Sequence, residues 1–427
     1  MNRLKCLQRW ALGLFLGMAI AGLASCAFGG DRTSENSSIE FWTMQLQPQF
    51  TEYFDDAIAN FEADRPPTRI TWVDVPWSAM ERKILASVSA RTAPDVVNLN
   101  PNFASLLAGR NAWLDLQATV PEVARELYWS NLWQASVLGD RTFGIPWYVT
   151  TRITIYNTDL LRAAGIETPP TTYAELADFA RQVKEKTGKY AFFATVVPED
   201  SGEVLESLVQ MGMELIDANG QAAFNTPEGK AAFGYWVDLY QQELLPREAL
   251  TQGHRRAIEL YQAGEVALLA SGPQFLQTIA QNAPTIAQVS EVAPQIVGQT
   301  GKKSVAVMNL VIPRDTDKPD AAIAWALYIT NPENQLAFAK LTNTLPSTRE
   351  SLDDPYFQTL PPESSPVDVA RLVSASQLPD AQVLVPPMKD IDRLQQILYD
   401  NLQAAMLNQK SVDAALSDAE EAWNRLS

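Results

Sequence analysis

The sequence has 427 residues, of which 46% are apolar and 19% are charged, and its formal net charge is −17. This length favours more than one domain, because a single hydrophobic core stops growing at roughly 250–300 residues. The composition is that of a folded globular chain and excludes a disordered one. No basic block interrupts the acidic surplus, so nucleic acid is a poor partner, since phosphate binding depends on clustered lysine and arginine.

The first 25 residues have the pattern of an export signal. Three basic residues, Arg3, Lys5 and Arg9, precede an apolar run over 10–23 that is too short to span a membrane comfortably. The run ends in Leu-Ala-Ser-Cys at 23–26, which resembles the lipobox of bacterial lipoproteins. The resemblance implies a signal peptide over 1–25, lipidation at Cys26 and a flexible tether over 26–37. An ordinary export signal with an incidental cysteine, or a signal anchor, are the alternatives.

The two cysteines restrict the chemistry of the mature chain. Cys6 lies inside the signal and Cys26 at its predicted cleavage point. If Cys26 carries the lipid, no thiol remains for a disulfide, for nucleophilic catalysis or for a cysteine-ligated zinc. We expect no cofactor and no metal.

Strands and helices alternate over the first hundred residues of the mature chain. The pattern predicts strands at 38–44, 69–75 and 94–100, with amphipathic helices at 53–63 and 78–90 between them. This order is typical of an α/β fold with a parallel sheet, in which ligands collect beyond the carboxyl ends of the strands. Four amides occupy those ends: Gln45, Gln47, Asn100 and Asn102.

The stretch from Gly144 to Asn157 is the most informative one. Its part over 148–156 is almost entirely β-branched or aromatic and predicts one strand. One face carries Val149, Thr151, Ile153 and Ile155, whereas the other carries Tyr148, Thr150, Arg152, Thr154 and Tyr156. A half-buried edge strand is one interpretation. The other is a strand that crosses between two domains and lines their cleft with its polar face. Asn157 then caps a helix that begins near Leu160.

Several later segments complete the pattern. A β-rich run covers 304–312, a helix is expected at 321–330, and Leu345-Pro346 interrupts a helical pattern. The tail over 366–427 is helical by its apolar periodicity.

In order and spacing, these segments resemble the extracellular solute-binding proteins of carbohydrate ABC transporters, the maltose-binding-protein-like family. The resemblance rests on Ile-Glu-Phe-Trp-Thr-Met-Gln at 39–45, Pro-Asp-Val-Val at 94–97, Gly-Ile-Pro-Trp-Tyr at 144–148 and Tyr-Asn-Thr-Asp-Leu-Leu at 156–161. It continues through 261–273, Asn-Leu-Val-Ile-Pro at 309–313 and Leu-Pro-Ser-Thr-Arg at 345–349. It covers essentially the whole mature chain.

The resemblance implies a two-lobed α/β periplasmic-binding-protein fold of type II, with three hinge crossings and a helical C-terminal tail. Lobe one would comprise 37–149 and 308–346, and lobe two 150–307 and 347–427. The crossings would lie near 149–152, 304–309 and 345–349. A sugar would bind in the cleft between the lobes.

A sugar site needs aromatic rings against the apolar C–H faces and planar polar groups around the hydroxyls. Among the aromatic residues we expect Trp42 and Trp236 in the core, and Trp147 and Tyr148 against the ligand. The predicted ligand-binding set is Gln45, Gln47, Asn100, Asn102, Trp147, Tyr148, Arg152, Gly272, Gln274, Asn309 and Lys389. Gly272 precedes a helix start that Pro273 would open, where free amides suit hydroxyls or an anion.

Two departures from the family pattern favour a small or polar ligand. The family often has an aromatic residue at the position of Gln274, and a tryptophan in the segment 386–390, where this chain has Pro-Pro-Met-Lys-Asp. Both weaken the case for a long maltodextrin.

The sequence favours a binding protein over an enzyme. The single histidine, His254, is interpreted as a surface residue beside Arg255 and Arg256, and no nucleophile motif accompanies it. A carboxylate cluster, Glu199, Asp200, Glu203 and Glu206, is interpreted as a solvated face or as hydrogen-bond acceptors at the rim of the site. A glycoside hydrolase would need two such carboxylates across a substrate.

We therefore expect a monomeric, lipid-anchored sugar-binding protein at the extracytoplasmic face of the cell envelope, where it serves the permease of an ABC importer. The ligand would be a mono-, di- or short oligosaccharide. A polyol or glycerol-phosphate ligand and a secreted glycan-active hydrolase remain the alternatives.

Overall fold

The N-terminal strands begin a large sheet that later segments complete. The computed structural model describes residues 38–198, 200, 202–385, 387–388 and 390–426. The large sheet has seven strands: six run in the order β11-β6-β10-β3-β1-β2, and β12 pairs separately with β10. Their bounds are β1 Ser38–Met44, β2 Arg69–Val75, β3 Val96–Leu99, β6 Ile145–Thr151, β10 Lys303–Val311, β11 Leu345–Pro346 and β12 Ala381–Gln382. β1 is parallel to β2 and β3, whereas β10 is antiparallel to β3 and β6.

Amphipathic helices bury their apolar faces against this sheet. The longer ones are α1 Thr51–Asp64, α2 Trp77–Ala90, α3 Pro101–Ala108, α14 Pro319–Ile329 and α15 Pro332–Thr342. Short helices and a hairpin connect them: α4 Leu116–Thr119, α5 Glu122–Arg125, α6 Ser130–Gln134, β4 Val137–Leu138, β5 Arg141–Thr142, α16 Arg349–Leu352 and α17 Pro355–Gln358. Phe41, Phe54, Trp147 and Trp325 are fully buried and pack ring against ring in this core.

A smaller sheet of three strands has the order β8-β7-β9, and both neighbours of β7 are antiparallel to it. The strands are β7 Ile153–Asn157, β8 Leu268–Ser271 and β9 Ser290–Pro294. Its helices are α7 Thr158–Ala164, α8 Tyr173–Thr187, α9 Glu203–Gln210, α10 Pro227–Gln241, η1 Arg247–Leu250, α11 His254–Gln262, α12 Phe275–Asn282 and α13 Pro284–Ala287. The predicted cap is confirmed: Asn157 Oδ1 accepts hydrogen bonds from the backbone N–H groups of Asp159 and Leu160.

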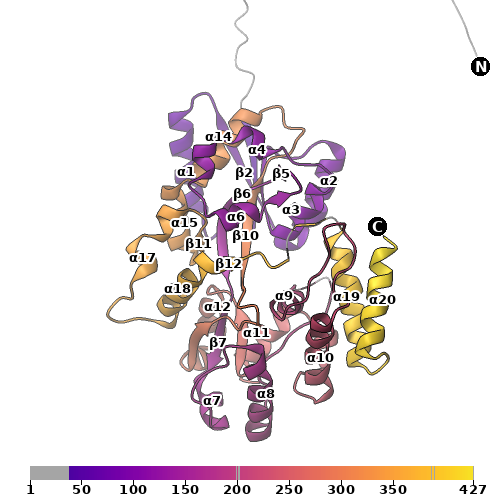
Figure 1. Ribbon diagram of the computed structural model, residues 1–427. Helices are drawn as coiled ribbons and strands as arrows, with labels where there is room; N and C mark the ends of the chain where they lie inside the picture. Colours follow the sequence, from indigo (N-terminus) through magenta and orange to yellow (C-terminus); the bar gives the residue numbers. More distant parts are fainter. Residues whose placement is uncertain (1–37, 199, 201, 386, 389, 427) are drawn as a thin grey trace, which may run out of the picture. The chain divides into compact units, whose positions relative to one another are not determined.

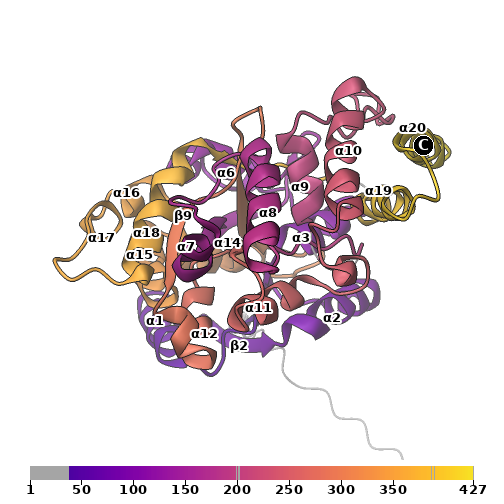
Figure 2. The same cartoon turned by 90° about the horizontal axis from the view of Figure 1, so that it is seen from below.

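The C-terminal tail divides between two places. α18 Pro366–Gln377 packs mainly on β9 and also contacts β6 and β7, and η2 Leu378–Asp380 follows it (Figure 2). α19 Ile391–Met406 and α20 Val412–Asn424 lie beside α10 (Figure 1), in the same core as Trp236. The predictions that Trp42 and Trp236 belong to the core are confirmed.

The predicted single strand over 148–156 is wrong in one respect. The chain forms two strands, β6 in the large sheet and β7 in the small one, and they are separated at Arg152. The predicted alternation holds, since Val149, Thr151, Ile153 and Ile155 are all buried. A strand can change sheets here without exposing its apolar face, because the period of two continues through the break.

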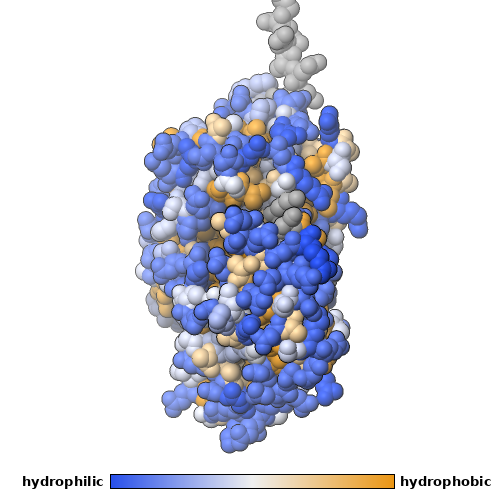
Figure 3. Space-filling model, turned by 45° about the vertical axis from the view of Figure 1, so that its right-hand side comes forward, coloured by the Kyte–Doolittle hydropathy of each residue, from blue (hydrophilic) through white to orange (hydrophobic). Residues whose placement is uncertain are grey.

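The surface is largely polar. On the face shown in Figure 3, hydrophilic side chains predominate and apolar ones are scattered among them. Within the described part of the chain, none of the helices has the length and apolar character needed to cross a bilayer.

Candidate functional site

Polar side chains gather at the carboxyl ends of β1 and β2, as the parallel topology requires. Asp74, near the end of β2, organises them: its Oδ1 accepts from the Thr43 hydroxyl at 2.6 Å and from the Leu46 N–H at 2.9 Å. Its Oδ2 accepts from the Gln47 N–H at 3.1 Å. These bonds fix the loop after β1, which carries Gln45 and Gln47 with both side chains exposed. We call Gln45, Gln47, Asp74 and Trp77 the polar shelf.

Trp77 is the aromatic residue that the sequence analysis missed. It begins α2, the residue is 45% exposed, and its backbone N–H donates to Gln45 Oε1 at 3.4 Å. An exposed tryptophan next to amides has the composition of a sugar subsite. Its signal in the sequence was its position, directly after Pro76 at the end of a predicted parallel strand.

Trp147 lies in the core, not at a surface. It has no exposed area, and its ring stacks on Phe338 with centroids 5.0 Å apart and packs against Phe41. The prediction that Trp147 offers a ring face to a ligand does not fit this placement. The reason is a distant partner: Phe338, from α15, stacks on the ring of Trp147 and covers it.

Tyr148 is half-buried and its hydroxyl donates to Asn98 Oδ1 at 3.4 Å. Burial, with a smaller contribution from the charge of Asp74, raises its pKa above the ordinary 10.0, so the phenol remains a donor at neutral pH. Tyr148 therefore contacts β3 through the side chain of Asn98.

Two predicted polar residues have structural partners. Asn309 is buried in β10, where its Oδ1 accepts from the Ser136 hydroxyl and its backbone C=O accepts from Asn98. Asn100 caps α3, and its Oδ1 accepts from the Phe103 N–H at 2.9 Å. Asn309 is thus a core residue, whereas Asn100 remains partly exposed at the end of β3. Lys389, Cys26 and the side chain of Asn102 lie outside the described residues.

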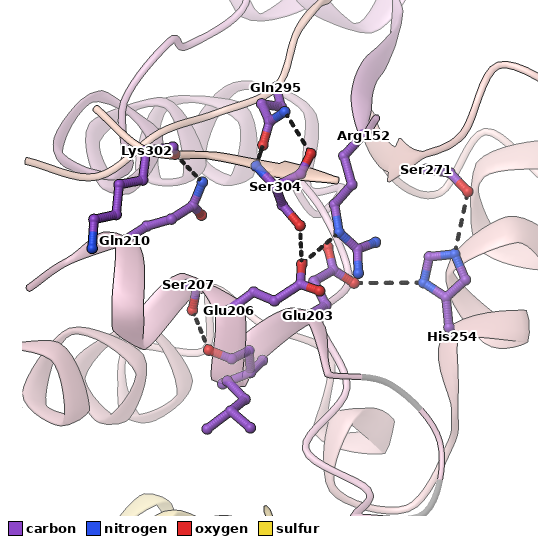
Figure 4. A network of polar contacts seen from close by, with 12 residues as sticks. Arg152, Glu203, Glu206, Ser207, Gln210, His254, Ser271, Gln295, Lys302 and Ser304 are labelled. Atoms are coloured by element: carbon purple, nitrogen blue, oxygen red, sulfur yellow. Dashed lines mark hydrogen bonds and ion pairs between the residues drawn. The ribbon is translucent and has the colours of Figure 1, made fainter. Parts of the chain in front are cut away.

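Arg152 joins a network of polar contacts at the break between β6 and β7 (Figure 4). Its Nε donates to Glu206 Oε2 at 3.0 Å, and the Ser304 hydroxyl donates to the same oxygen at 2.9 Å. Burial opposes the charge of Arg152, but Glu206 and Glu203 outweigh it and raise the pKa of the guanidinium. Arg152 therefore forms an ion pair within the protein, and its contact with a ligand stays a prediction.

His254 is not the surface residue that the sequence suggested. Its side chain is 22% exposed, its Nδ1 lies 3.5 Å from Glu203 Oε2, and its Nε2 lies 3.4 Å from the Ser271 hydroxyl (Figure 4). Burial alone would raise the pKa of Glu203. The hydrogen bond from His254 and the charge of Arg152 outweigh that effect, so the pKa of Glu203 lies below its ordinary value.

The predicted solvated face of carboxylates needs the same correction. Glu203 and Glu206 are mostly buried in this network. Asp200 is exposed, and its carboxylate accepts from the backbone N–H of His254 at 2.6 Å. Glu199 lies outside the described residues. A cavity of about 50 Å³ beside the network has Tyr173, Gln210 and Trp236 in its wall. It has room for water but not for a sugar, because ligand pockets measure roughly 300–1,000 Å³.

The loop before α12 differs from its prediction. The helix begins at Phe275, after Pro273, and the Gln274 side chain folds back over Gly272. A Cβ at Gly272 would lie 2.2 Å from Gln274 Oε1, so this glycine makes room for the amide of Gln274. That oxygen is buried and has no hydrogen-bond partner among the described residues. Among all the residues that the structure describes, no group of three or more His, Cys, Asp or Glu side chains could hold a metal ion.

Comparisons with known proteins agree on one family. The family model described as bacterial extracellular solute-binding protein matches residues 47–336. The chain is 46% identical to a protein of Synechococcus sp. MITs9220, provisionally described as an oligosaccharide periplasmic-binding protein and solved with zinc. The match covers 91% of this chain and 98% of that one, with a TM-score of 0.86.

Two further relatives are more distant. The cyclic alpha-maltosyl-1,6-maltose binding protein of Arthrobacter globiformis is 22% identical, with coverage of 92% and 98% and a TM-score of 0.78, and shares the fold. The arabinooligosaccharide-binding protein of Halalkalibacterium halodurans is 25% identical over 77% of this chain and 75% of its own. The expected two-lobed α/β fold of type II is thereby confirmed.

Proposed function

Because this chain belongs to the family of bacterial extracellular solute-binding proteins, we propose that it is the sugar-binding component of an ABC importer. It binds a mono-, di- or short oligosaccharide between its two lobes and delivers it to a membrane permease. The observation that carries the proposal is the polar shelf itself, in which the exposed Trp77 contacts Gln45 through its backbone N–H and Asp74 fixes the loop that carries Gln45 and Gln47. The relatives named above, whose descriptions refer to oligosaccharides, support it.

The polar shelf suits a sugar for two chemical reasons. The face of an indole packs against the apolar C–H face of a pyranose or furanose ring. Amide and carboxylate oxygens accept from the hydroxyls around its edge, and the two glutamine side chains also donate. Gln274, from the other proposed lobe, remains a proposed contact; its carbonyl oxygen is buried and has no partner among the described residues, so its side chain would turn outward to meet a sugar.

The predicted lobe boundaries remain part of this proposal. The strand assignments that support them are those of β6, which ends in the large sheet at Thr151, and β7, which begins in the small sheet at Ile153. β10 belongs to the large sheet from Lys303 onward, a few residues earlier than the boundary at 307/308 that the sequence suggests.

A neutral sugar fits better than a sugar phosphate or glycerol phosphate. The phosphate alternative depended on Arg152, Lys389 and the helix start at Gly272. Arg152 is paired with Glu206, and the Gln274 side chain folds back over Gly272. Removing a guanidinium from such a pair to bind a ligand would leave a carboxylate without its counterion.

We also propose that the protein is not an enzyme. A glycoside hydrolase needs two carboxylates that face a substrate, and Glu206 instead binds Arg152 and Ser304, while Glu203 contacts His254. The family and the relatives named above are binding proteins. Release of reducing ends from oligosaccharides by the purified protein would contradict this part of the proposal.

A thermal-shift screen tests the ligand class. Mono-, di- and trisaccharides, polyols and sugar phosphates are each added in excess, and the melting temperature is measured. A ligand at 100 times its Kd stabilises the native state by about 2.7 kcal/mol, which raises Tm by several degrees. We expect a neutral sugar to give the largest shift. A shift with sugar phosphates alone would favour the phosphate alternative.

The proposed location has its own test. Replacement of Cys26 by Ala is expected to release the protein from membranes, because the lipid would have no sulfur to bind. Cell fractionation with a labelled fatty acid measures both the release and the site of acylation. Label that persists in the Cys26→Ala protein would place the anchor elsewhere.

A further inference from the structure

Three of the connections between the two sheets lie close together in this fold. The first is the break at Arg152, between β6 and β7, and the second is the segment 295–302, between β9 and β10. The third leaves β11 and leads, through residues 347–365, to α18, which contacts β6, β7 and β9. Each carries the chain between the large and the small sheet or their helices, so each has to deform when the lobes move.

Gln295 holds the second connection together. Its side chain bonds Ser304 in both directions: Oε1 accepts from the Ser304 N–H at 2.7 Å, and Nε2 donates to the Ser304 C=O at 3.2 Å (Figure 4). Gln295 is 6% exposed and Ser304 is 4% exposed, so water does not compete for these bonds. Gln295, directly after β9 of the small sheet, is thereby hydrogen-bonded to Ser304, near the start of β10 in the large sheet.

Gln377 joins the second connection to the other two. It is the last residue of α18 and is 2% exposed. Its Oε1 accepts from the Gln295 N–H at 3.1 Å, and its Nε2 donates to the Arg152 C=O at 3.1 Å. One side chain therefore contacts the backbone of the first and the second connection, from a helix that belongs to the third.

A second link acts in parallel. Glu206 Oε2 accepts from both Arg152 Nε and the Ser304 hydroxyl, so the first and second connections also share a carboxylate. Nearby, the Thr151 hydroxyl donates to the C=O of Ser374 in α18 at 3.4 Å. These contacts reinforce the link that Gln377 makes.

We infer that Gln295 and Gln377 are positioning residues that lock the three connections into one hinge. This inference rests on the proposed function, in which the lobes close around a solute. Without the lock, each connection could change its backbone torsions alone, and the lobes could twist as well as bend. With it, a change at Arg152 is transmitted to Ser304 through two amide side chains, so the lobes move about a common axis.

Backbone amide exchange in the ligand-free protein tests the lock. Gln377→Met keeps the size of the side chain and removes its donor and acceptor. Gln377 contacts Gln295 and Arg152 directly, but reaches Ser304 only through Gln295. In Gln377→Met we expect backbone amide exchange to be on the order of fivefold to tenfold faster than in the parent protein, at 151–154 and also at 303–306. The reciprocal variant Gln295→Met is expected to accelerate amide exchange in both segments relative to the parent protein. The double variant is expected to accelerate it no more than either single variant does.

Gln403→Met is the matched control. Gln403 is a part-buried glutamine that donates to the Val196 C=O from α19, away from the three connections. It should leave 151–154 and 303–306 unchanged. Acceleration in only one of the two segments, in both lock variants, would overturn the inference, because the connections would then be independent. If Gln377→Met does not fold, Gln295→Met alone decides by its effect on 151–154. None of these outcomes depends on a ligand, so failure of the lock and failure of the proposed sugar binding are distinguishable.

Discussion

At the scale of single residues, Trp77 is the strongest candidate for a ligand contact. Replacing an engaged aromatic ring with alanine costs on the order of 2 kcal/mol, or roughly 30-fold in affinity. We expect Trp77→Ala to weaken binding of the sugar found by the screen by about this amount, without a loss of stability, because the ring is already 45% exposed. Isothermal titration measures the first effect and urea unfolding the second. Leu360→Ala, at an exposed apolar residue 42% accessible, is the control, and equal affinities for both variants would exclude Trp77 from the site.

Trp147 should behave in the opposite way. Its ring is fully buried between Phe338 and Phe41, so Trp147→Ala leaves a large cavity. We expect the free energy of unfolding to fall by about 3–5 kcal/mol. Urea unfolding checks this value. A variant of normal stability that no longer bound sugar would restore the interpretation of Trp147 as a ligand contact.

These residues show what a sequence alone reveals. The alternation around Tyr148 predicted which side chains share a face, since the period of a strand is local. It did not reveal that Trp147 is buried, because its stacking partner Phe338 lies far along the chain. His254 was misread for the same reason: its partners Glu203 and Ser271 belong to other elements. Trp77 was missed because an exposed aromatic residue has no periodic signal.

At the scale of elements, the start of α18 should respond to acid. Asp368 accepts from the Ser365 N–H at 2.9 Å and from its hydroxyl at 2.7 Å, and it pairs with Arg371 at 2.6 Å. The hydrogen bonds from Ser365 and the charge of Arg371 lower the pKa of Asp368 from 3.8 to about 2. Because the folded pKa is below the ordinary one, this stabilisation is present above pH 4 and disappears as pH falls toward 2.

Asp368→Asn should therefore reduce stability at pH 7 and change it less near pH 2, where the carboxylate of the parent protein is itself protonated. Urea unfolding of both proteins across this range tests the sign. A difference between the two proteins that grows toward low pH would contradict it.

The elements themselves were largely predictable. Strands β1 and β2 and helices α1 and α2 lie within two residues of their expected bounds, since alternation and helical spacing are properties of short segments. A crossing was expected near 149–152, but the composition predicted one continuous strand and not a break at Arg152, because both sides of the break have the same composition. Sheet membership depends on partners such as β10 and β9, which the chain supplies more than a hundred residues later.

At the scale of the whole molecule, we expect closure on binding. A solute that touches both lobes has more contacts in the closed state and shifts the population toward it by that difference in affinity. Hinge closure of periplasmic binding proteins is a standard example of such a transition. Small-angle scattering should show a smaller radius of gyration at saturating sugar than without it. The Trp77→Ala protein at the same sugar concentration is the control, and an unchanged radius in the parent protein at saturation would argue for a rigid binder.

The strand order of the large sheet also constrains how the chain folds. β10, at residues 303–311, lies between β3 and β6, which come from the first 151 residues of the chain. Until β10 arrives, both of these strands have an open edge, and a chain that is still emerging cannot complete its first core. Pairing over such long sequence separations is slow. For a protein threaded through a membrane this delay is useful, since an early core would obstruct passage, but it also leaves two apolar strand edges open to aggregation in any chain that stops before residue 303.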